Sequence, residues 1–175
     1  MSGNRDGRVA VRLATEDDAA TIARLVAAHA AYEGAPEQCR ATAEDIRREG
    51  FGARPLFEVL LAERAGRTLG FAMFLEVFSS WEGRSILFLE DLYVDEAARG
   101  IGVGRRLLAR LAAIARARGC PRLDWLVAAD NPARAFYHRL GGTHLGDWRF
   151  YRLHGAPLAA LAAEGEAASS DPDDS

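Results

Sequence analysis

Two adjacent carboxylates, Glu90 and Asp91, interrupt an otherwise apolar run over residues 85–94. Such a run is typical of a strand buried on both faces, where carboxylates are seldom found. A carboxylate near an ammonium can accept the proton that the nitrogen must lose before it acts as a nucleophile, and it also attracts the cation. A hydrogen-bonded structural acid is the alternative for each residue. Because neighbouring strand residues point to opposite faces, only one of the two faces a given cleft unless a bulge intervenes.

Tyr137 is a second candidate for proton chemistry. It lies within residues 133–140, directly after the helix-starting pair Asn131-Pro132. A phenol has an ordinary pKa of about 10 and a thiol one of about 8.5, so a tyrosine can hydrogen-bond or protonate a departing thiolate. Packing as a core aromatic beside Phe136 is the alternative interpretation.

A glycine-rich segment, Arg99-Gly100-Ile101-Gly102-Val103-Gly104-Arg105-Arg106, lies between a predicted strand and a predicted helix. Free backbone N–H groups at a helix start hold anions, and glycines let the backbone approach phosphate oxygens closely. Arginines in the first turn oppose the helix dipole, which also favours a bound polyanion. A flexible turn is the alternative. The dinucleotide pattern GxGxxG does not fit, because Arg105 or Leu107 stands where the last glycine is required.

The elements that must position these residues follow from apolar periodicity, capping residues and glycine-containing turns. Strands are predicted over residues 8–14, 57–64, 68–78, 85–94 and 122–128, followed by a closing hairpin around Gly146. Helices are predicted from a cap at Thr15 to Ala31, from a cap at Thr42 to the glycines at 50–52, and over residues 103–118, 131–140 and 157–163. The acidic, small-residue segment 164–175 is predicted to be disordered.

The composition excludes several function classes. The chain has 175 residues, close to one average domain, and all 22 residues counted as Lys+Arg are arginines. Schiff-base chemistry and a Walker A phosphate loop both need a lysine, so both are excluded. A net charge of -3 and a pI near 5.8 argue against nucleic-acid binding and favour small cationic partners.

Cysteine and histidine usage indicates neither a disulfide framework nor a metal site. Cys39 and Cys120 match no CxxC spacing, which favours a reduced, cytoplasmic protein. No apolar run is long enough to span a membrane, and no secretory signal is expected. His29 lies on the apolar face of its predicted helix, and none of the four histidines has a recognisable partner. Neither a metal site nor a serine triad is therefore expected.

The spacing Arg99-x-x-Gly102-x-Gly104 between a strand and a helix resembles the acetyl-CoA pyrophosphate loop of the GCN5-related N-acetyltransferases (GNAT superfamily). The predicted element order agrees with this family. The resemblance implies an α/β fold whose mixed, mostly antiparallel central sheet is splayed at the acetyl-CoA site and flanked by helices. It also implies a single N-acetyltransferase domain over residues 1–163, followed by the tail.

Several segments are similar to the spermidine/spermine (diamine) acetyltransferase branch and its thialysine-acetylating relatives. They are Ala31-Tyr32-Glu33, Gly50-Phe51-Gly52, Gly70-Phe71-Ala72, Ser80-Trp81-Glu82-Gly83-Arg84, residues 89–94, and Asn131-Pro132 through Phe136-Tyr137. The resemblance implies transfer of acetyl from acetyl-CoA to a polyamine, a diamine or a thialysine-like amino acid, by a homodimer. Two alternatives remain open: a protein or antibiotic amine as acceptor, and an acyl-CoA-binding regulatory module without turnover.

The resemblance also assigns roles residue by residue. Glu90 and Tyr137 are the implied catalytic base and proton donor. The implied acetyl-CoA contacts are Leu92, Tyr93, Val94, Arg99, Gly100, Ile101, Gly102, Val103, Gly104, Arg105, Asn131, Pro132 and Ala133. The implied acceptor-site residues are Tyr32, Glu33, Trp81, Glu90, Asp91 and Asp124.

Overall fold

The computed structural model describes residues 7–169. The chain separates into two compact units, Met1–Ala128 and Ala129–Ser175. The single domain inferred over residues 1–163 stays a prediction.

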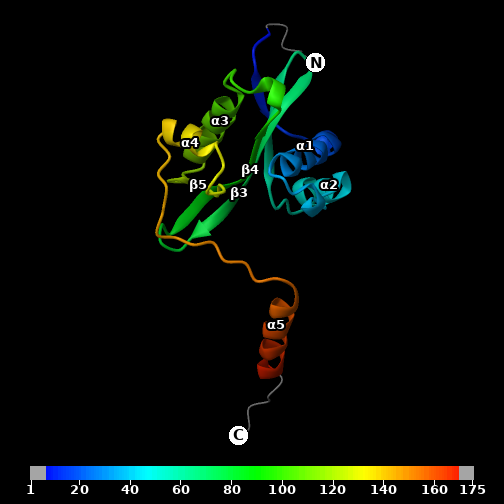
Figure 1. Ribbon diagram of the computed structural model, residues 1–175, viewed down its shortest axis with the longest axis vertical. Coiled ribbons are helices and arrows are strands. Elements are labelled where there is room, and N and C mark those ends of the chain that lie inside the picture. Colours follow the sequence, from blue (N-terminus) through cyan, green and yellow to red (C-terminus); the bar gives the residue numbers. More distant parts are fainter. Residues whose placement is uncertain (1–6, 170–175) are drawn as a thin grey trace. The chain divides into compact units, whose positions relative to one another are not determined.

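The first unit is built on a five-stranded sheet with the strand order β1-β2-β3-β4-β5. Neighbours pair antiparallel from β1 to β4, whereas β5 runs parallel to β4. The mixed, mostly antiparallel sheet expected from the sequence is therefore confirmed (Figure 1). The strands are β1 Ala10–Leu13, β2 Glu58–Arg64, β3 Arg67–Ser79, β4 Arg84–Val94 and β5 Leu123–Trp125.

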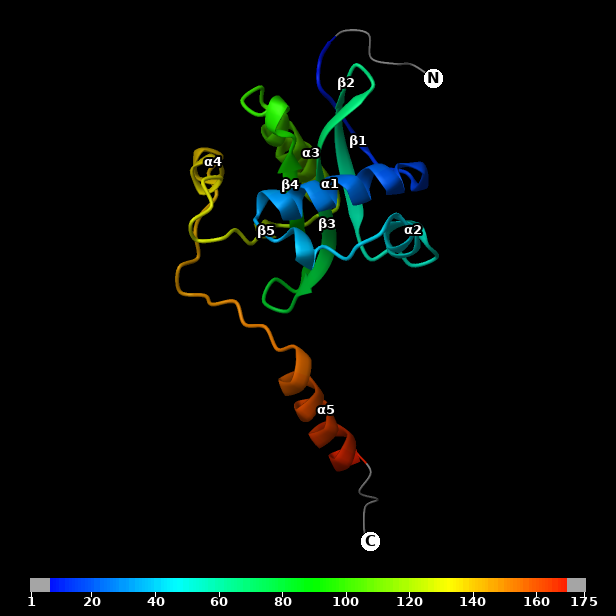
Figure 2. The same cartoon turned by 45° about the vertical axis from the view of Figure 1, so that its right-hand side comes forward.

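Helices cover both faces of this sheet. Helices α1 (Ala19–Tyr32) and α2 (Ala43–Phe51) lie together on one face, and α3 (Val103–Ala117) lies on the other (Figures 1 and 2). Short 3-10 turns complete the unit: η1 Glu16–Asp18, η2 Pro36–Gln38 and η3 Glu96–Ala98. Helices α2 and α3 begin and end close to their predicted bounds, whereas the predicted cap Thr15 starts the turn η1 and α1 itself begins at Ala19.

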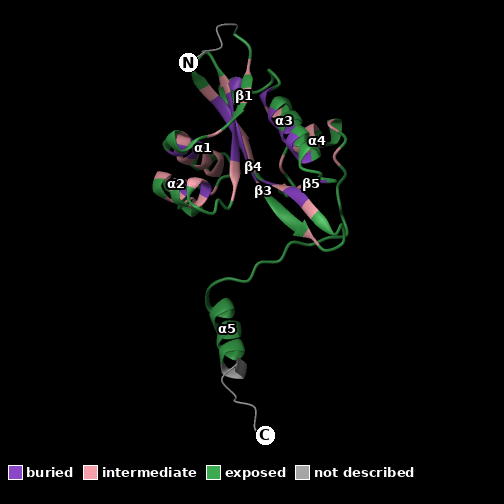
Figure 3. Cartoon of the chain, turned by 180° about the vertical axis from the view of Figure 1, so that it is seen from behind, coloured by how far each residue is buried: buried purple, intermediate pink, exposed green. Residues whose placement is uncertain are grey.

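The hydrophobic core lies between the sheet and the inward helix faces, where buried residues concentrate (Figure 3). Ile22 and Leu25 of α1 pack with Phe71 of β3 in one cluster. On the other face, α3 buries its apolar stripe, which includes Leu107 and Leu111. Full burial of such a side chain contributes about 1.5–3 kcal/mol, so the two layers fix α1 and α3 on the sheet.

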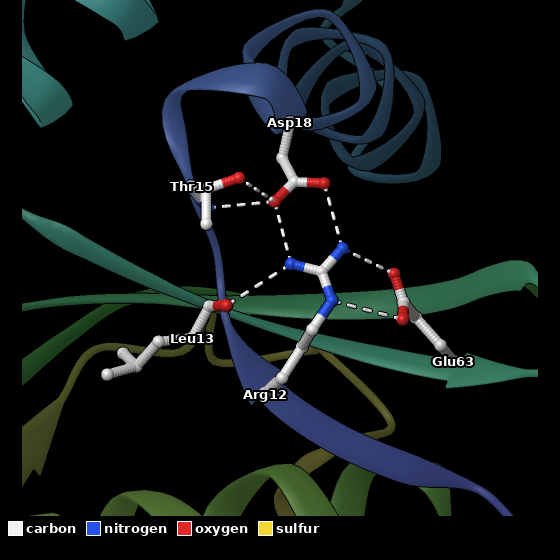
Figure 4. Close-up of polar contacts among 5 residues, drawn as sticks. All are labelled: Arg12, Leu13, Thr15, Asp18 and Glu63. Carbon is white, nitrogen blue, oxygen red and sulfur yellow. Dashed lines mark hydrogen bonds and ion pairs between the residues drawn. The ribbon is translucent and has the colours of Figure 1, made fainter. Parts of the chain in front are cut away.

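Arg12 of β1 ties the start of the first helical segment to the sheet (Figure 4). Its guanidinium donates two hydrogen bonds to Asp18, at 2.7 and 2.8 Å, and two to Glu63 of β2, at 2.7 and 3.1 Å. Asp18 also accepts the backbone N–H of Thr15, at 2.8 Å. The hydrogen bonds from Arg12 are the largest cause that lowers the pKa of Asp18 to about 2. In this Arg12 network, both acids, Asp18 and Glu63, form an ion pair with Arg12.

The second unit departs from the sequence predictions. It contains α4 (Arg134–Arg139) and α5 (Gly155–Ser169). The closing hairpin predicted around Gly146 is wrong, because residues 143–154 form no strand in the structure. An isolated hairpin is marginal without a further strand or a packing surface.

The C-terminal helix is longer than predicted. It continues past Ala163 to Ser169, so the first part of the predicted disordered tail is helical. Residues 155–169 are rich in alanine, the strongest helix former, and also contain leucine. Their helix propensity explains why the helix continues into the first part of the acidic segment. The rest of the predicted tail, residues 170–175, lies outside the described residues.

Candidate active site

Strand β4 has a bulge at Glu90. In the β3–β4 ladder Asp91 is opposite Met73 and Leu89 is opposite Phe74, so Glu90 has no residue opposite it. A bulge inserts one extra residue and resets which side chains share a face. The expectation that only one of the two carboxylates faces a given cleft depended on an unbulged strand, and that condition is not met.

Strand β4 also loses its second neighbour at the bulge. Strand β5 was predicted over residues 122–128 but spans only Leu123–Trp125, and it pairs with β4 only at residues 87–89. Within residues 7–169, β4 beyond Glu90 is paired with β3 alone. The sheet therefore opens beside the half-buried residues Leu92, Tyr93 and Val94, which pair with β3 on one side and face no strand of the described residues on the other.

The C-terminal end of α1 brings three of its residues to this part of β4. His29 Nδ1 lies 3.3 Å from Asp91 Oδ1, and His29 Nε2 lies 3.7 Å from Glu33 Oε1. The Tyr93 ring lies 5.8 Å from the His29 ring and 6.5 Å from the Tyr32 ring, between centroids. These five residues are called the His29 cluster below.

Sequence reasoning missed His29. The prediction that no histidine has a partner is wrong for this residue, which contacts Asp91 and Glu33. Glu33 stands four residues after His29 on the same helix, a spacing at which opposite charges meet. That spacing, at a helix C-terminus where a cation is favoured, was the available signal.

Burial and neighbouring charge shift two pKa values here. Burial lowers the pKa of His29, but hydrogen bonding and attraction to Asp91, together with attraction to Glu33, leave it above the ordinary value of 6.5. Burial, and then repulsion from Asp91, raise the pKa of Glu90 above its ordinary 4.5. Within residues 7–169 the Glu90 carboxylate has no ion pair or hydrogen bond. Glu90 is thus a carboxylate whose pKa is shifted toward that of a useful base.

The glycine-rich segment forms the start of α3. Gly100 and Gly102 have φ of 80° and 86°, values that favour glycine, and a Cβ at either residue would project into open space. Gly102 is the N-cap, no side chain caps the helix, and its first turn holds no acid. The first backbone N–H groups of α3 therefore lack intrahelical or side-chain acceptors, as a phosphate-binding turn requires. Exposed Arg105 adds positive charge.

Arg99 links this loop to the His29 cluster. Its guanidinium lies over the Tyr32 ring, 4.2 Å from the centroid, and its Nε donates to the Val94 carbonyl at 3.2 Å. A cation over an aromatic face is stabilised by the ring's negative charge distribution. The end of α1, the end of β4 and the start of the loop are therefore connected within the first unit.

Trp81 and Asp124 are not brought to the His29 cluster. Trp81 lies in the turn before β4 and is 85% exposed. It precedes Glu90 by most of the strand, and six strand residues already span roughly 20 Å. Asp124 of β5 is paired with Arg122, whose Nε lies 3.0 Å from its carboxylate. An acceptor-site role for Trp81 and Asp124 stays a prediction.

The remaining sequence candidates lie in the second unit. The Asn131 side chain accepts the backbone N–H of Ala133, at 2.8 Å, and so caps the turn that leads into α4. Half-buried Tyr137 stacks obliquely on Phe136, with ring centroids 5.3 Å apart. The implied roles of Asn131, Pro132, Ala133 and Tyr137 stay predictions.

Residues 7–169 contain neither a membrane-spanning helix nor a cluster of metal-ligating side chains. No helix in this range has the length and apolarity needed to cross a bilayer. No group of three or more metal-ligating side chains gathers there in a geometry suited to an ion. The expectation of a metal-free enzyme stays a prediction.

Comparison with known proteins identifies the family. Residues 22–142 match the acetyltransferase (GNAT) family. Thialysine N-epsilon-acetyltransferase of Sus scrofa is 31% identical over 89% of this chain and 98% of its own length. Spermidine/spermine N(1)-acetyltransferase-like protein 1 of Homo sapiens is 36% identical over 88% of this chain, which spans about a quarter (24%) of that protein.

Solved structures agree on the fold. An integron cassette protein from the mobile metagenome of V. cholerae has a TM-score of 0.74 and 27% identity, covering 88% of this chain and 97% of its own. A ribosomal-protein-alanine N-acetyltransferase from Brucella melitensis has a TM-score of 0.68 and 23% identity. The match covers 85% of this chain and 100% of that chain. The splayed sheet, the glycine-rich turn and these matches together show that the chain is an acetyltransferase that belongs to the GNAT family.

Proposed function

We propose that the protein transfers acetyl from acetyl-CoA to a small primary amine that carries positive charge: a polyamine, a diamine or a thialysine-like amino acid. The observation that carries the proposal is the concentration of carboxylates, Glu33, Glu90 and Asp91, at the point where β4 leaves β5. Carboxylates at the mouth of a splayed sheet attract an ammonium and can take its proton. The names of the curated relatives support the same acceptor class.

Glu90 is the proposed general base. Its raised pKa makes it a stronger proton acceptor than an ordinary glutamate. It takes the proton of the bound ammonium, directly or through water, and the free amine then attacks the thioester carbon. Asp91 adds negative charge beside Glu90, which attracts a cationic acceptor to the site.

The acetyl donor is proposed to bind along the open edge of β4 and the start of α3. GNAT acetyltransferases use acetyl-CoA as co-substrate. The backbone of Leu92, Tyr93 and Val94 would hold the pantetheine arm, and the segment from Arg99 to Arg105 would hold the pyrophosphate. This agrees with the uncapped N–H groups of α3 and with the open space around Gly100 and Gly102.

The backbone amides and a phenol complete the proposed reaction. A backbone N–H near Leu92 or Tyr93 stabilises negative charge on the thioester oxygen. Tyr137 donates a proton to the departing thiolate. Asn131, Pro132 and Ala133 add coenzyme contacts, and the protein works as a cytoplasmic homodimer.

Thiol release from acetyl-CoA tests the proposal. The purified protein is assayed with spermidine, spermine, putrescine, thialysine, lysine and one peptide. Turnover with the small amines, and a preference for polyamines or for thialysine, supports the proposal and selects the branch. Turnover with the peptide alone would move the acceptor to a protein amine. Thermal stabilisation by acetyl-CoA without thiol release would instead indicate a regulatory binding module.

A further inference from the structure

His29 lies between two carboxylates. Its two ring nitrogens face different acids, with Nδ1 3.3 Å from Asp91 and Nε2 3.7 Å from Glu33. Only a protonated imidazole carries hydrogen on both nitrogens, so only that form can donate to both acids at once. Protonated His29 therefore stands where a bound ammonium would find its counter-charges.

The packing around the ring holds it in this position. The His29 side chain is 19% exposed, and the Phe71 ring of β3 meets it edge-on with the centroids 6.5 Å apart. Tyr93 of β4 lies against it at 5.8 Å. Turning the imidazole out to solvent would give up both ring contacts, so the side chain stays between the acids.

The two charged groups in contact with the His29 ring are both acidic, and the cation Arg99 lies beyond them over the Tyr32 ring. The helix of His29 contributes Glu33, and β4 contributes Asp91, which is in turn coupled to Glu90. Strand β3 contributes only the uncharged Phe71. Within residues 7–169 the ring has no further ion pair or hydrogen bond.

We propose that His29 is a specificity-determining residue of the acceptor site, because its protonated ring competes with a second ammonium of the acceptor for Asp91 and Glu33. This inference rests on the proposed amine acetyltransfer. A monoamine presents a single ammonium, which Glu90 deprotonates, and it does not compete with His29. A diamine or polyamine brings a second positive charge, and His29 must lose its proton to relieve the repulsion.

Thermodynamic linkage predicts the direction in which diamine affinity changes with pH. If a diamine binds better when His29 is neutral, binding the diamine lowers the pKa of His29. The KM for the diamine then rises as the pH falls through the pKa of His29. Each unit by which binding lowers that pKa corresponds to about a tenfold change in diamine affinity between high and low pH.

The first test needs no turnover. The imidazole of His29 is titrated by NMR in the full-length protein without acetyl-CoA, alone and with saturating putrescine or propylamine. We expect putrescine to lower the pKa of His29 by at least about half a unit and propylamine to leave it unchanged. Equal pKa values in the three titrations would overturn the inference.

The second test separates His29 from the shared proton step at Glu90. The ratio of the KM for putrescine to the KM for propylamine is measured from pH 6 to 8.5, so that effects common to both amines cancel. We expect the ratio to rise at least about threefold toward low pH in the parent protein and to stay flat in His29→Gln. His144→Gln is the matched control, and it should keep the parent slope.

The outcomes distinguish this inference from the proposed function. If neither amine is acetylated while putrescine still lowers the pKa of His29, the proposed reaction fails and the competition stands. If both amines are acetylated but the KM ratio of the parent protein does not change with pH, the proposed reaction stands and the proposed specificity role of His29 is wrong. His29→Leu, which removes the ring without adding a polar group, should match His29→Gln in the slope of the ratio.

Discussion

The Arg12 network and the His29 cluster each place one basic side chain between two acids, but the contacts and the kind of base differ. Arg12 donates four short hydrogen bonds to Asp18 and Glu63, all between 2.7 and 3.1 Å. His29 meets its two acids at 3.3 and 3.7 Å. Arginine cannot lose its proton in a protein, whereas histidine titrates near neutral pH. The first group of charges is therefore permanently balanced, and the second has a cation that can be exchanged.

The two groups also differ in whether their neighbouring acids are paired, as Glu90 shows. Both acids of the Arg12 network are paired, but the Glu90 carboxylate beside the His29 cluster has no ion pair or hydrogen bond within residues 7–169. A carboxylate left without a counter-charge is available to bind a cation.

The largest expected effect is from Glu90→Gln. The amide is isosteric but cannot take a proton, so kcat should fall at least about tenfold. The acidic limb of the pH profile of kcat/KM, which lies above pH 4.5 because the pKa of Glu90 is raised, should disappear. Glu63→Gln, in the Arg12 network, serves as the control and should keep the parent kcat. Near-normal turnover in Glu90→Gln would remove Glu90 from the proposed mechanism.

Tyr137→Phe should also lower kcat at least about tenfold, because it removes only the proposed proton donor. The KM for acetyl-CoA should change little, since the ring and its packing on Phe136 are kept. Steady-state thiol release at saturating amine measures the effect. A variant as active as the parent would leave Tyr137 a packing residue.

Asp91→Asn is expected to act on acceptor binding more than on turnover. Removing this charge weakens the attraction for the ammonium, and we expect the KM for a diamine to rise about fivefold with a smaller change in kcat. The same variant removes the main cause that raises the pKa of His29, so that pKa should fall in an NMR titration. A His29 pKa that stays raised would show that Asp91 is not its partner.

Arg12→Gln should lower the free energy of unfolding by about 1 kcal/mol, because four charge-assisted hydrogen bonds are lost from a site that is partly open to water. Urea denaturation followed by circular dichroism measures this change. The KM values for both substrates should stay at the parent level. A large rise in either KM would mean that the network also supports the active site.

Stability should also depend on pH through Asp18. The pKa of Asp18 in the folded protein is lowered to about 2, mainly by the hydrogen bonds from Arg12. Its contribution to stability is therefore complete above the ordinary value of 3.8 and is lost as the pH falls from about 4 toward 2. Asp18→Asn should flatten this part of a stability-versus-pH curve. An unchanged curve would contradict the role of Asp18 in the network.

Local elements of the fold were predictable because their causes are local. Thr42 caps α2 through Asp45 with the reciprocal hydrogen bonds that the sequence pattern predicts. The turn at residues 65–66 is a short glycine-containing link between two apolar runs, a pattern typical of a hairpin, and it joins β2 to β3. The glycines at 100 and 102 adopt the positive φ values that only glycine adopts at little cost.

The contacts of the candidate site were only partly predictable. The sequence indicated Glu90, Asp91, Tyr32 and Glu33 as acids and aromatics near an acceptor, but it did not show which of them meet. Glu90 lies at a bulge because of the way β4 pairs with β3, and no feature of β4 alone fixes that register. The prediction of a closing hairpin around Gly146 was wrong for a similar reason, because a strand needs a partner strand that the local sequence does not supply.

The sequence by itself determined the order of the elements from β1 to α4, the glycine-rich loop before α3 and the family, because each depends on residues close together in the chain. Only the tertiary structure decided that His29 meets Asp91 and that Glu90 stands out from the ladder. Those two features depend on how α1 docks on the sheet and on the pairing of β4, both of which are set by burial over the whole core. A histidine on the apolar face of its helix therefore lies, once the core forms, between two carboxylates.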